Sequence, residues 1–333
     1  MKRKLNLLLM LLLAWPMGML AAGTTWQTAT EITSGKSVTG SLSESVTEQW
    51  YKIVVTENGE VTIMVGAGSG LGLRYTTLYA LADGELHERG SIWGGSESDP
   101  ATLTVKDCAK GTYYLMVPRN SGEGKFTLAY TFKAMSASYA NDSEPNDTYQ
   151  QAKAVKVNTS VTGHLGYVYY EDRDGVDWYK VNVTENGALA ITMKAHGSLG
   201  LSYTTVYALD SEGNSQDRGS IWGGSDDAPG VLTVKDCSKG TYYVRVGRNS
   251  GQGGYTLDCR FTAMSASYAD DKEPNDTYQK AQALDINKTV TGHLGYEYWN
   301  DTDGEDWYKV QVPENGEIKL RKQGMTIAPL GEA

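Results

Sequence analysis

Hydrophobic and polar residues alternate along most of the chain, which is the pattern of half-buried β-strands. The alternation is clear over Tyr179–Val183, Leu189–Met193, Tyr242–Val246 and Tyr255–Phe261. Glycine-rich turns such as Asn186-Gly187 separate these runs. About eight short strands in roughly 120 residues fit an antiparallel β-sandwich of the jelly-roll type. We therefore expect an all-β fold.

The sequence repeats itself with a period of domain size. Ser91–Ser96 recurs 129 positions later as Ser220–Ser225, and the tripeptide Trp-Tyr-Lys occurs three times. A period this long indicates tandem domains and not a solenoid. The expected organisation is a signal peptide (residues 1–22), a sandwich called copy 1 (23–134), a linker (135–141), a sandwich called copy 2 (142–263), a linker (264–270) and a truncated third repeat called copy 3 (271–333).

Copy 3 holds only about half of the strand pattern of a domain. Its alternation ends near Leu320, and residues 321–333 match neither other copy. A half-sandwich leaves strands without partners. Two interpretations are open at this stage: a truncated or frameshifted reading frame, or a half-domain that docks on copy 2.

The N-terminus has the layout of a secretory signal peptide. A Lys-Arg-Lys segment at residues 2–4 precedes the apolar run Leu5–Leu13, and small residues follow at Ala21 and Ala22. An uncleaved anchor is the alternative. No second apolar run of about 18 residues follows, so we expect no integral membrane segment. The prediction is a secreted or cell-surface bacterial protein.

The charge balance excludes one class of partner. The 333 residues include 40 acidic and 30 basic side chains, a formal net charge of −10, which becomes −13 when residues 2–4 are removed. Nucleic-acid binding needs a basic face, so no nucleic-acid partner is expected.

Much of the acid excess lies in two clusters. Copy 2 opens with Asp142, Glu144 and Asn146, whose alternate spacing points the side chains the same way on an extended segment. Asp174 and Asp177 come directly before a strand. Carboxylate and amide oxygens are the ligands that Ca²⁺ prefers. The alternative is a pair of solvated acidic loops. The clusters hold no His or Cys, so zinc is not expected.

Several motifs occur in a fixed order in copy 2: Glu144–Thr148, Val161–Leu165, Asp174–Val181, Gly240–Val246 and Gly254–Leu257. In this order the chain resembles the bacterial pre-peptidase C-terminal domain, a family that includes the collagen-binding domains of clostridial collagenases. The resemblance implies a jelly-roll sandwich with calcium between the N-terminal linker and the sandwich. The ligands it implies are Asp142, Glu144, Asn146, Asp147, Asp174 and Asp177 in copy 2, and Asp271, Glu273, Asn275, Asp276, Asp303 and Asp306 in copy 3.

Copy 1 departs from this pattern. Neither Thr24–Ala29 nor Ser45–Gln49 offers the set of carboxylates, so we expect copy 1 to fold without that metal. The aromatic residues that contact collagen in the family are replaced by Gly247 and Asn249 in copy 2. Collagen is therefore not the expected ligand.

Trp93 and Trp222 are further candidates for ligand binding, together with Arg89 and Arg218 in the same segments. An exposed Trp beside Arg can stack on a sugar ring or hold a peptide. The alternative is a Trp that covers the end of the sandwich.

The cysteines allow two interpretations. Cys237 and Cys259 could form a disulfide within copy 2 of a secreted protein. Copy 1 keeps Cys108 but has Tyr130 in place of the second cysteine, which favours small buried thiols.

No catalytic motif is recognisable, so we expect a non-enzyme. The predicted function is that of a secreted, calcium-binding module protein that binds an extracellular polysaccharide or protein. The alternatives are an accessory or propeptide-like fragment of a secreted peptidase without its catalytic domain, and a purely structural spacer.

Overall fold

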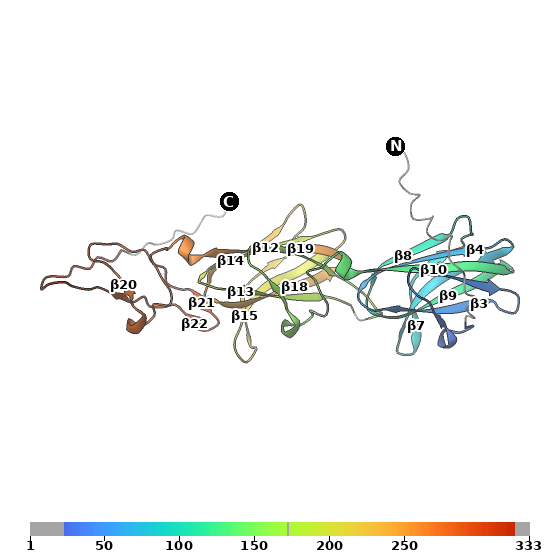
Figure 1. The fold of residues 1–333 in the computed structure, drawn as a ribbon, viewed down its shortest axis with the longest axis horizontal. Coiled ribbons are helices and arrows are strands. Elements are labelled where there is room, and N and C mark those ends of the chain that lie inside the picture. Colours follow the sequence, from blue (N-terminus) through green and yellow to red (C-terminus); the bar gives the residue numbers. More distant parts are fainter. Residues whose placement is uncertain (1–22, 172, 324–333) are drawn as a thin grey trace, which may run out of the picture.

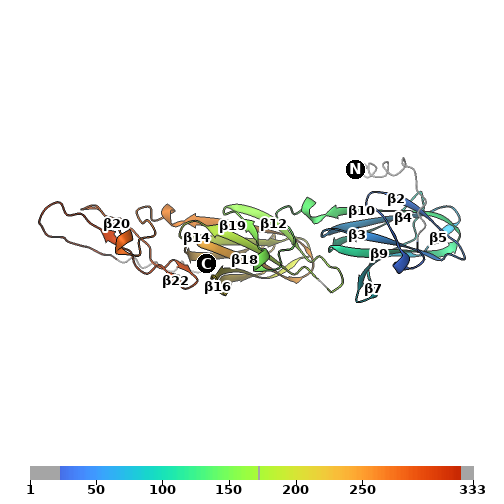
Figure 2. The ribbon, with the colours of Figure 1, turned by 60° about the horizontal axis from the view of Figure 1, so that its bottom comes forward.

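The computed structural model describes residues 23–171 and 173–323; the expected signal peptide lies outside them. The three copies follow one another along an elongated molecule, with copy 1 at one end and copy 3 at the other (Figure 1). The all-β prediction is confirmed, because copies 1 and 2 each consist of two β-sheets, with short 3-10 turns as their helical segments. A turn of Figure 1 about its long axis shows the same linear order (Figure 2).

In copy 1 the two sheets pack face to face. The first contains, in spatial order, β1 (Thr30–Glu31), β3 (Glu48–Val55), β9 (Gly111–Gly122), β6 (Tyr75–Ala82) and β7 (Glu85–Trp93), with β5 (Leu71–Leu73) paired to β9. The second contains β2 (Ser37–Leu42), β10 (Gly124–Ala134), β4 (Gly59–Ala67) and β8 (Ala101–Cys108).

Copy 2 repeats this topology. Its first sheet contains β11 (Lys153–Val155), β13 (Val176–Val183), β18 (Gly240–Ser250), β15 (Gly200–Leu209) and β16 (Ser215–Trp222). Its second contains β12 (Thr159–Leu165), β19 (Gly253–Ala263), β14 (Gly187–Ala195) and β17 (Gly230–Cys237).

The alternation seen in the sequence produces the core between the sheets. Along β14, every second side chain is buried, and Leu189, Ile191 and Met193 have no exposed surface. Each such side chain contributes about 1.5–3 kcal/mol through the apolar area that it removes from water. The two copies have separate cores of closely similar composition, so each sandwich has its own hydrophobic stabilisation.

Copy 3 is different, because its described part contains only two-residue strands. β20 (Gln282–Ala283) pairs with β23 (Tyr308–Lys309), while β21 (Glu297–Tyr298) and β22 (Asp301–Thr302) form a hairpin. The hairpin adds to the β17 edge of copy 2. The described part of copy 3 is therefore docked on copy 2 through this hairpin. Ile318 and Leu320 remain exposed.

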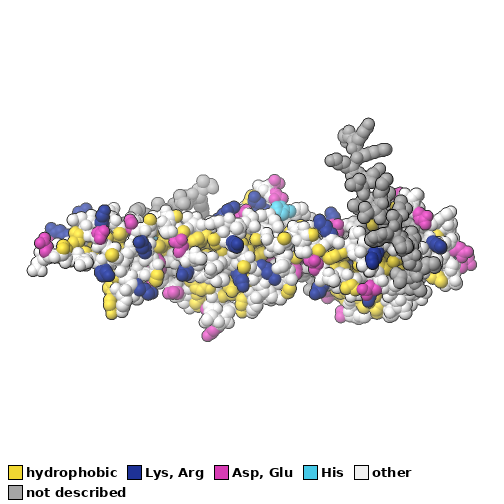
Figure 3. Space-filling view, in the orientation of Figure 1, with side chains coloured by type: hydrophobic (Ala, Val, Ile, Leu, Met, Phe, Trp, Pro, Cys, Tyr) yellow, Lys and Arg dark blue, Asp and Glu magenta, His cyan; other side chains and the backbone are white. Residues whose placement is uncertain are grey.

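The surface carries charges of both signs. Lys, Arg, Asp and Glu side chains are interspersed over the face in Figure 3, without one region of a single sign. Within the described ranges, no helix is long and apolar enough to cross a membrane.

The disulfide considered from the sequence is wrong in this structure. Cys108, Cys237 and Cys259 are all free, buried thiols. The reason is the strand order: β14 lies between β17, which carries Cys237, and β19, which carries Cys259. Neighbouring strands are about 4.8 Å apart, so two strands separated by a third cannot bring their Cβ atoms to disulfide distance.

We expect all three cysteines to react when the unfolded protein is alkylated without reductant. Mass spectrometry of the product should show three added groups, and a reducing agent should leave the melting temperature unchanged. A single added group would show that Cys237 and Cys259 are joined.

Candidate metal centre

The segment that enters copy 2 is tied to the sandwich by Asp142. Its carboxylate accepts a hydrogen bond from the backbone N–H of His164 on β12 (2.8 Å) and another from the Asn146 side-chain amide (2.8 Å). The backbone carbonyl of Asn146 in turn accepts a hydrogen bond from the backbone N–H of Trp178 on β13 (2.8 Å). The entering segment is thus held between one strand of each sheet.

Three carboxylates meet beside this segment. Glu144, Asp174 and Asp177 each place one oxygen so that all three atoms lie within 4.8 Å of one another. Glu144 belongs to the entering segment, Asp174 to the loop before β13, and Asp177 to β13 itself. Asp177 has no exposed surface. Sequence positions 30 apart are therefore brought together by the sandwich.

Many of the oxygens here are buried without a hydrogen-bond donor. They are Glu144 Oε1, Asn146 Oδ1, both oxygens of Asp174, and Asp177 Oδ1. A buried charge without a partner costs several kcal/mol. These oxygens have no protein donor and are all of the type that hard cations prefer, so the residues fit a hard metal ion.

Burial and crowding also raise the pKa values of these carboxyl groups in the metal-free chain. Burial, with smaller contributions from neighbouring carboxylates, raises the pKa of Glu144 to about 7 and that of Asp174 to about 9. Burial raises the pKa of Asp142 to about 6, and it holds that of Asp177 well above the ordinary value. At neutral pH Asp174 and Asp177 therefore favour a proton or a cation over the bare carboxylate.

Two tyrosines that were not predicted as site residues contact the cluster from the core. The Tyr255 hydroxyl on β19 donates to Asp177 Oδ2 and is itself hydrogen-bonded to the Tyr179 hydroxyl. Gly163 makes room for both, because a Cβ atom there would lie 2.3 Å from the Tyr255 oxygen. The only sequence signal was that Tyr179 and Tyr255 occupy inward positions of their strands.

Copy 3 has a similar cluster, with a different set of closest carboxylates. Asp271, Glu273 and Asp306 offer oxygens within 4.8 Å of one another. Asp271 accepts from the N–H of His293 (2.9 Å), as Asp142 does from His164. Burial raises the pKa of Glu273 to about 7 and that of Asp303 to about 6. Buried oxygens without a donor are Glu273 Oε1, Asn275 Oδ1, both oxygens of Asp303, and Asp306 Oδ1.

Copy 1 has neutral groups at the equivalent places. Gln49 stands where copy 2 has Asp177, and its side-chain oxygen accepts a hydrogen bond from Tyr51 (3.0 Å). Phe126 stands where copy 2 has Tyr255. The loop is also shorter: seven residues separate Leu42 from Trp50, whereas twelve separate Leu165 from Trp178.

Only some of the ligand residues predicted from the sequence lie within these clusters. Asp147 and Asp276 are exposed, outside the groups of mutually close oxygens. Both carboxylate oxygens of Asp142 accept hydrogen bonds, so this residue holds the entering segment in place beside the cluster. The other residues have buried oxygens without donors, or lie among the mutually close carboxylates.

The Trp and Arg candidates do not form one surface. Trp93 and Trp222 are 52% and 58% exposed, so about half of each side chain remains available for contact. Each packs edge-on against an exposed tyrosine, Tyr75 in copy 1 and Tyr203 in copy 2. The arginines lie elsewhere: Arg89 pairs with Asp107 (3.6 Å), and Arg218 pairs with Glu297 (2.8 Å), with both side chains largely buried.

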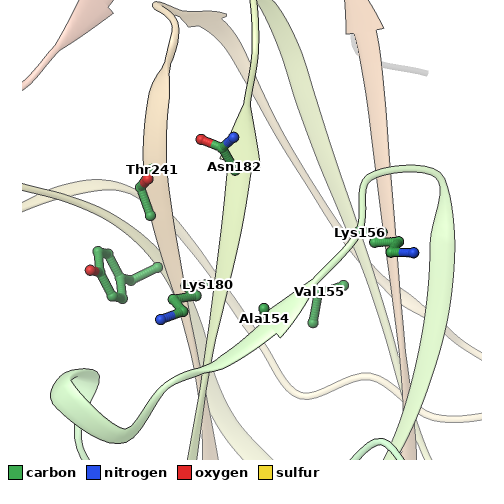
Figure 4. Close-up of a pocket in the computed structure, with 7 residues that line it drawn as sticks. Ala154, Val155, Lys156, Lys180, Asn182 and Thr241 are labelled. Carbon is green, nitrogen blue, oxygen red and sulfur yellow. The ribbon is translucent and has the colours of Figure 1, made fainter.

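An open pocket lies on copy 2, apart from the carboxylate cluster. Figure 4 shows its lining residues, in which two lysines and an asparagine are the main polar groups. The lining contains no carboxylate, so the pocket is not part of the candidate metal centre. It consists of Ala154, Val155, Lys156, Lys180, Asn182, Thr241 and Tyr243.

No family model and no curated protein matches the chain. Among solved structures, the chain is similar to the pre-peptidase C-terminal domain of a collagenase from Bacillus anthracis, with 20% identity over 35% of this chain and 99% of that one, and a TM-score of 0.27. The exported protein XepA is 10% identical over 69% of this chain and 88% of that one, with a TM-score of 0.23. The CBM22-1–CBM22-2 tandem domain of Xyn10C from Paenibacillus barcinonensis is 8% identical over 69% and 92%, with a TM-score of 0.21. At these identities and TM-scores the likenesses carry no argument about the role of this chain.

The raised pKa values predict the pH dependence of the metal-free protein. Above about pH 4 the unfolded chain releases protons that the folded chain holds up to about pH 6 on Asp142, about pH 7 on Glu144 and about pH 9 on Asp174. The contribution of these groups to stability therefore falls as pH rises through this range. Thermal unfolding in EDTA should show this decline, and Asp174→Asn should reduce it. An Asp174→Asn profile with the same slope as the unsubstituted chain would contradict the assignment.

Proposed function

We propose that the clusters of copies 2 and 3 each bind Ca²⁺. The observation that carries the proposal is the set of buried oxygens without donors around Glu144, Asp174 and Asp177, repeated in copy 3. An acidic cluster alone would be compatible with solvated loops. Buried oxygens that point to no protein donor need a cation or protons instead.

The chemistry of the donors favours Ca²⁺ over other metals. All the ligand candidates are oxygens, from carboxylates and one amide, and Ca²⁺ accepts six to eight of these in flexible geometry. Zinc would need His or Cys, and the described clusters contain neither. Mg²⁺ requires a smaller, near-octahedral set and retains several waters, which suits a largely buried cluster less well.

The ion would have a structural role. It would join the entering segment, through Glu144 and Asn146, to the loop and strand that carry Asp174 and Asp177. The linker before each sandwich would then be fixed relative to the sandwich. This role needs no chemistry on a substrate, and it agrees with a secreted, non-catalytic module protein.

The ligand surface that we propose consists of the exposed aromatic pairs. Tyr75 with Trp93 and Tyr203 with Trp222 occupy equivalent register positions on β6–β7 and β15–β16. All four side chains are more than half exposed. Flat aromatic faces stack on sugar rings, so we favour an extracellular polysaccharide over a protein ligand. The role of a peptidase accessory fragment rests on the sequence motifs alone.

Calcium should bind to the full chain in a calorimetric titration and stabilise it. At 100 times the dissociation constant, one site adds about 2.7 kcal/mol to the free energy of unfolding. Asp177→Asn should abolish most of the calcium stabilisation contributed by copy 2. In EDTA it should stabilise the chain by about 1–3 kcal/mol, because an amide avoids the cost of burying a carboxylate or of protonating it on folding.

The matched control is Asp227→Asn, at an exposed position of the same copy. It should leave both the calcium response and the stability in EDTA unchanged. The proposal fails if calcium gives no heat and no thermal shift, or if Asp177→Asn behaves like the control.

Trp93→Ala and Trp222→Ala should each weaken retention on a panel of immobilised bacterial and plant polysaccharides, by about tenfold in affinity for whichever glycan the unsubstituted chain binds. Tyr278→Ala in copy 3, which removes another exposed aromatic side chain, serves as the control. Binding unchanged by the double Trp substitution would place the ligand surface elsewhere.

A further inference from the structure

The loop that carries Asp174 also forms part of copy 1. The backbone N–H of Val168 donates to the carbonyl of Asp107 (2.8 Å), and the N–H of Ala109 donates to the carbonyl of Val168 (3.1 Å). Val168 thereby pairs in parallel with Cys108 at the end of β8. The loop of one sandwich extends the sheet of the preceding one and covers its edge.

Tyr169 enters a socket of copy 1, by which we mean the site formed by Leu81, Gly111, Thr112 and Tyr113. Its hydroxyl lies 2.7 Å from the carbonyl oxygen of Thr112 and 3.1 Å from that of Leu81. Its ring packs edge-on against Tyr113, with 5.2 Å between ring centroids. At Gly111 a Cβ atom would lie 2.4 Å from the Tyr169 ring. The socket therefore requires glycine at this position.

The second junction has the same construction. The Tyr298 hydroxyl of copy 3 lies 2.8 Å from the carbonyl oxygen of Leu209 and 3.0 Å from that of Thr241 in copy 2, and can donate to either. Its ring packs edge-on against Tyr242 at 5.3 Å, and a Cβ atom at Gly240 would lie 2.7 Å from it. Because the contacts are equivalent at both junctions, each repeat docks on the preceding one in the same way.

The base of the docking loop is also a wall of the candidate metal centre. The N–H of Gly166 donates to the carbonyl of Asp174 (2.9 Å), and the N–H of Asp174 donates to the carbonyl of Tyr167 (3.0 Å). Both side-chain oxygens of Asp174 lack a hydrogen-bond donor. Repulsion among the carboxylates without a cation would therefore act directly on the loop that carries Tyr169.

We propose that each complete sandwich carries a tyrosine socket for the repeat that follows it, and that cation binding in that repeat locks the docked tyrosine in place. The coupling rests on the proposed calcium site, whereas the socket itself does not. Coupling between two equilibria is reciprocal, so blocking the socket of copy 1 should weaken cation binding in copy 2. Copy 1 has a socket, but its shorter loop does not supply the equivalent of Tyr169.

The test measures the distance between copies 1 and 2 in the full chain. Spin labels are attached at Ser98→Cys and Asp227→Cys, two equivalent exposed loop positions, while the native cysteines are buried. Double electron–electron resonance with calcium should give one narrow distance distribution, which broadens in EDTA. Gly111→Ala and, as a second way to empty the socket, Tyr169→Ala should broaden it even with calcium.

The matched control is Gly240→Ala, the same change in the socket of copy 2, which should leave the distance between copies 1 and 2 narrow. Calorimetry on Gly111→Ala should show roughly fivefold or greater weakening of one calcium site.

A narrow distribution in both Gly111→Ala and Tyr169→Ala would overturn the socket. A narrow wild-type distribution in EDTA, or unchanged calcium affinity in Gly111→Ala, would overturn the coupling. No calcium binding in any variant, with broadening still caused by Gly111→Ala, would overturn the proposed function and the coupling but keep the socket.

Discussion

The burial of several carboxylates at one point is the constraint on which the structure of copies 2 and 3 depends. Asp177 is fully buried at the start of a core strand, with Glu144 and Asp174 within a few ångströms. Placing these groups together costs free energy through lost hydration and through repulsion. Copy 1 avoids the cost with Gln49 and Phe126. The same sandwich thus exists with and without the charged cluster, so the cluster is not needed for the fold itself.

The carboxylates lie where three separate parts of the chain meet: the entering segment, the loop before β13, and β13 itself. A cation at this place would connect all three, and the loop would connect them further to the preceding repeat through Val168 and Tyr169. The relative orientation of neighbouring copies, seen in Figure 1, would then depend on small local contacts at each junction. It would not require a large apolar interface between domains.

The fold could be predicted from the sequence because strand alternation and a repeat of 129 residues are strong signals. The acidic clusters could also be found, since Asp142 to Asp147 and Asp174 to Asp177 are concentrated in sequence. The contribution of Tyr255 could not, because it depends on which strand lies next to β13 across the core. The tyrosine socket was also missed, since Tyr169 contacts Leu81 and Gly111 of another repeat. The grouping of Trp222 with Arg218 was misleading, because a bulge in the pairing of β16 at Arg218 interrupts the alternation that would otherwise put residues four apart on one face.

Calcium in the cluster of copy 2 is the central claim, and anomalous diffraction from crystals grown with calcium tests it most directly. The predicted result is an anomalous peak about 2.3–2.6 Å from oxygens of Glu144, Asp174 and Asp177, with an equivalent peak beside Asp271, Glu273 and Asp306. Ordered side chains at both clusters without a peak at either would contradict the account.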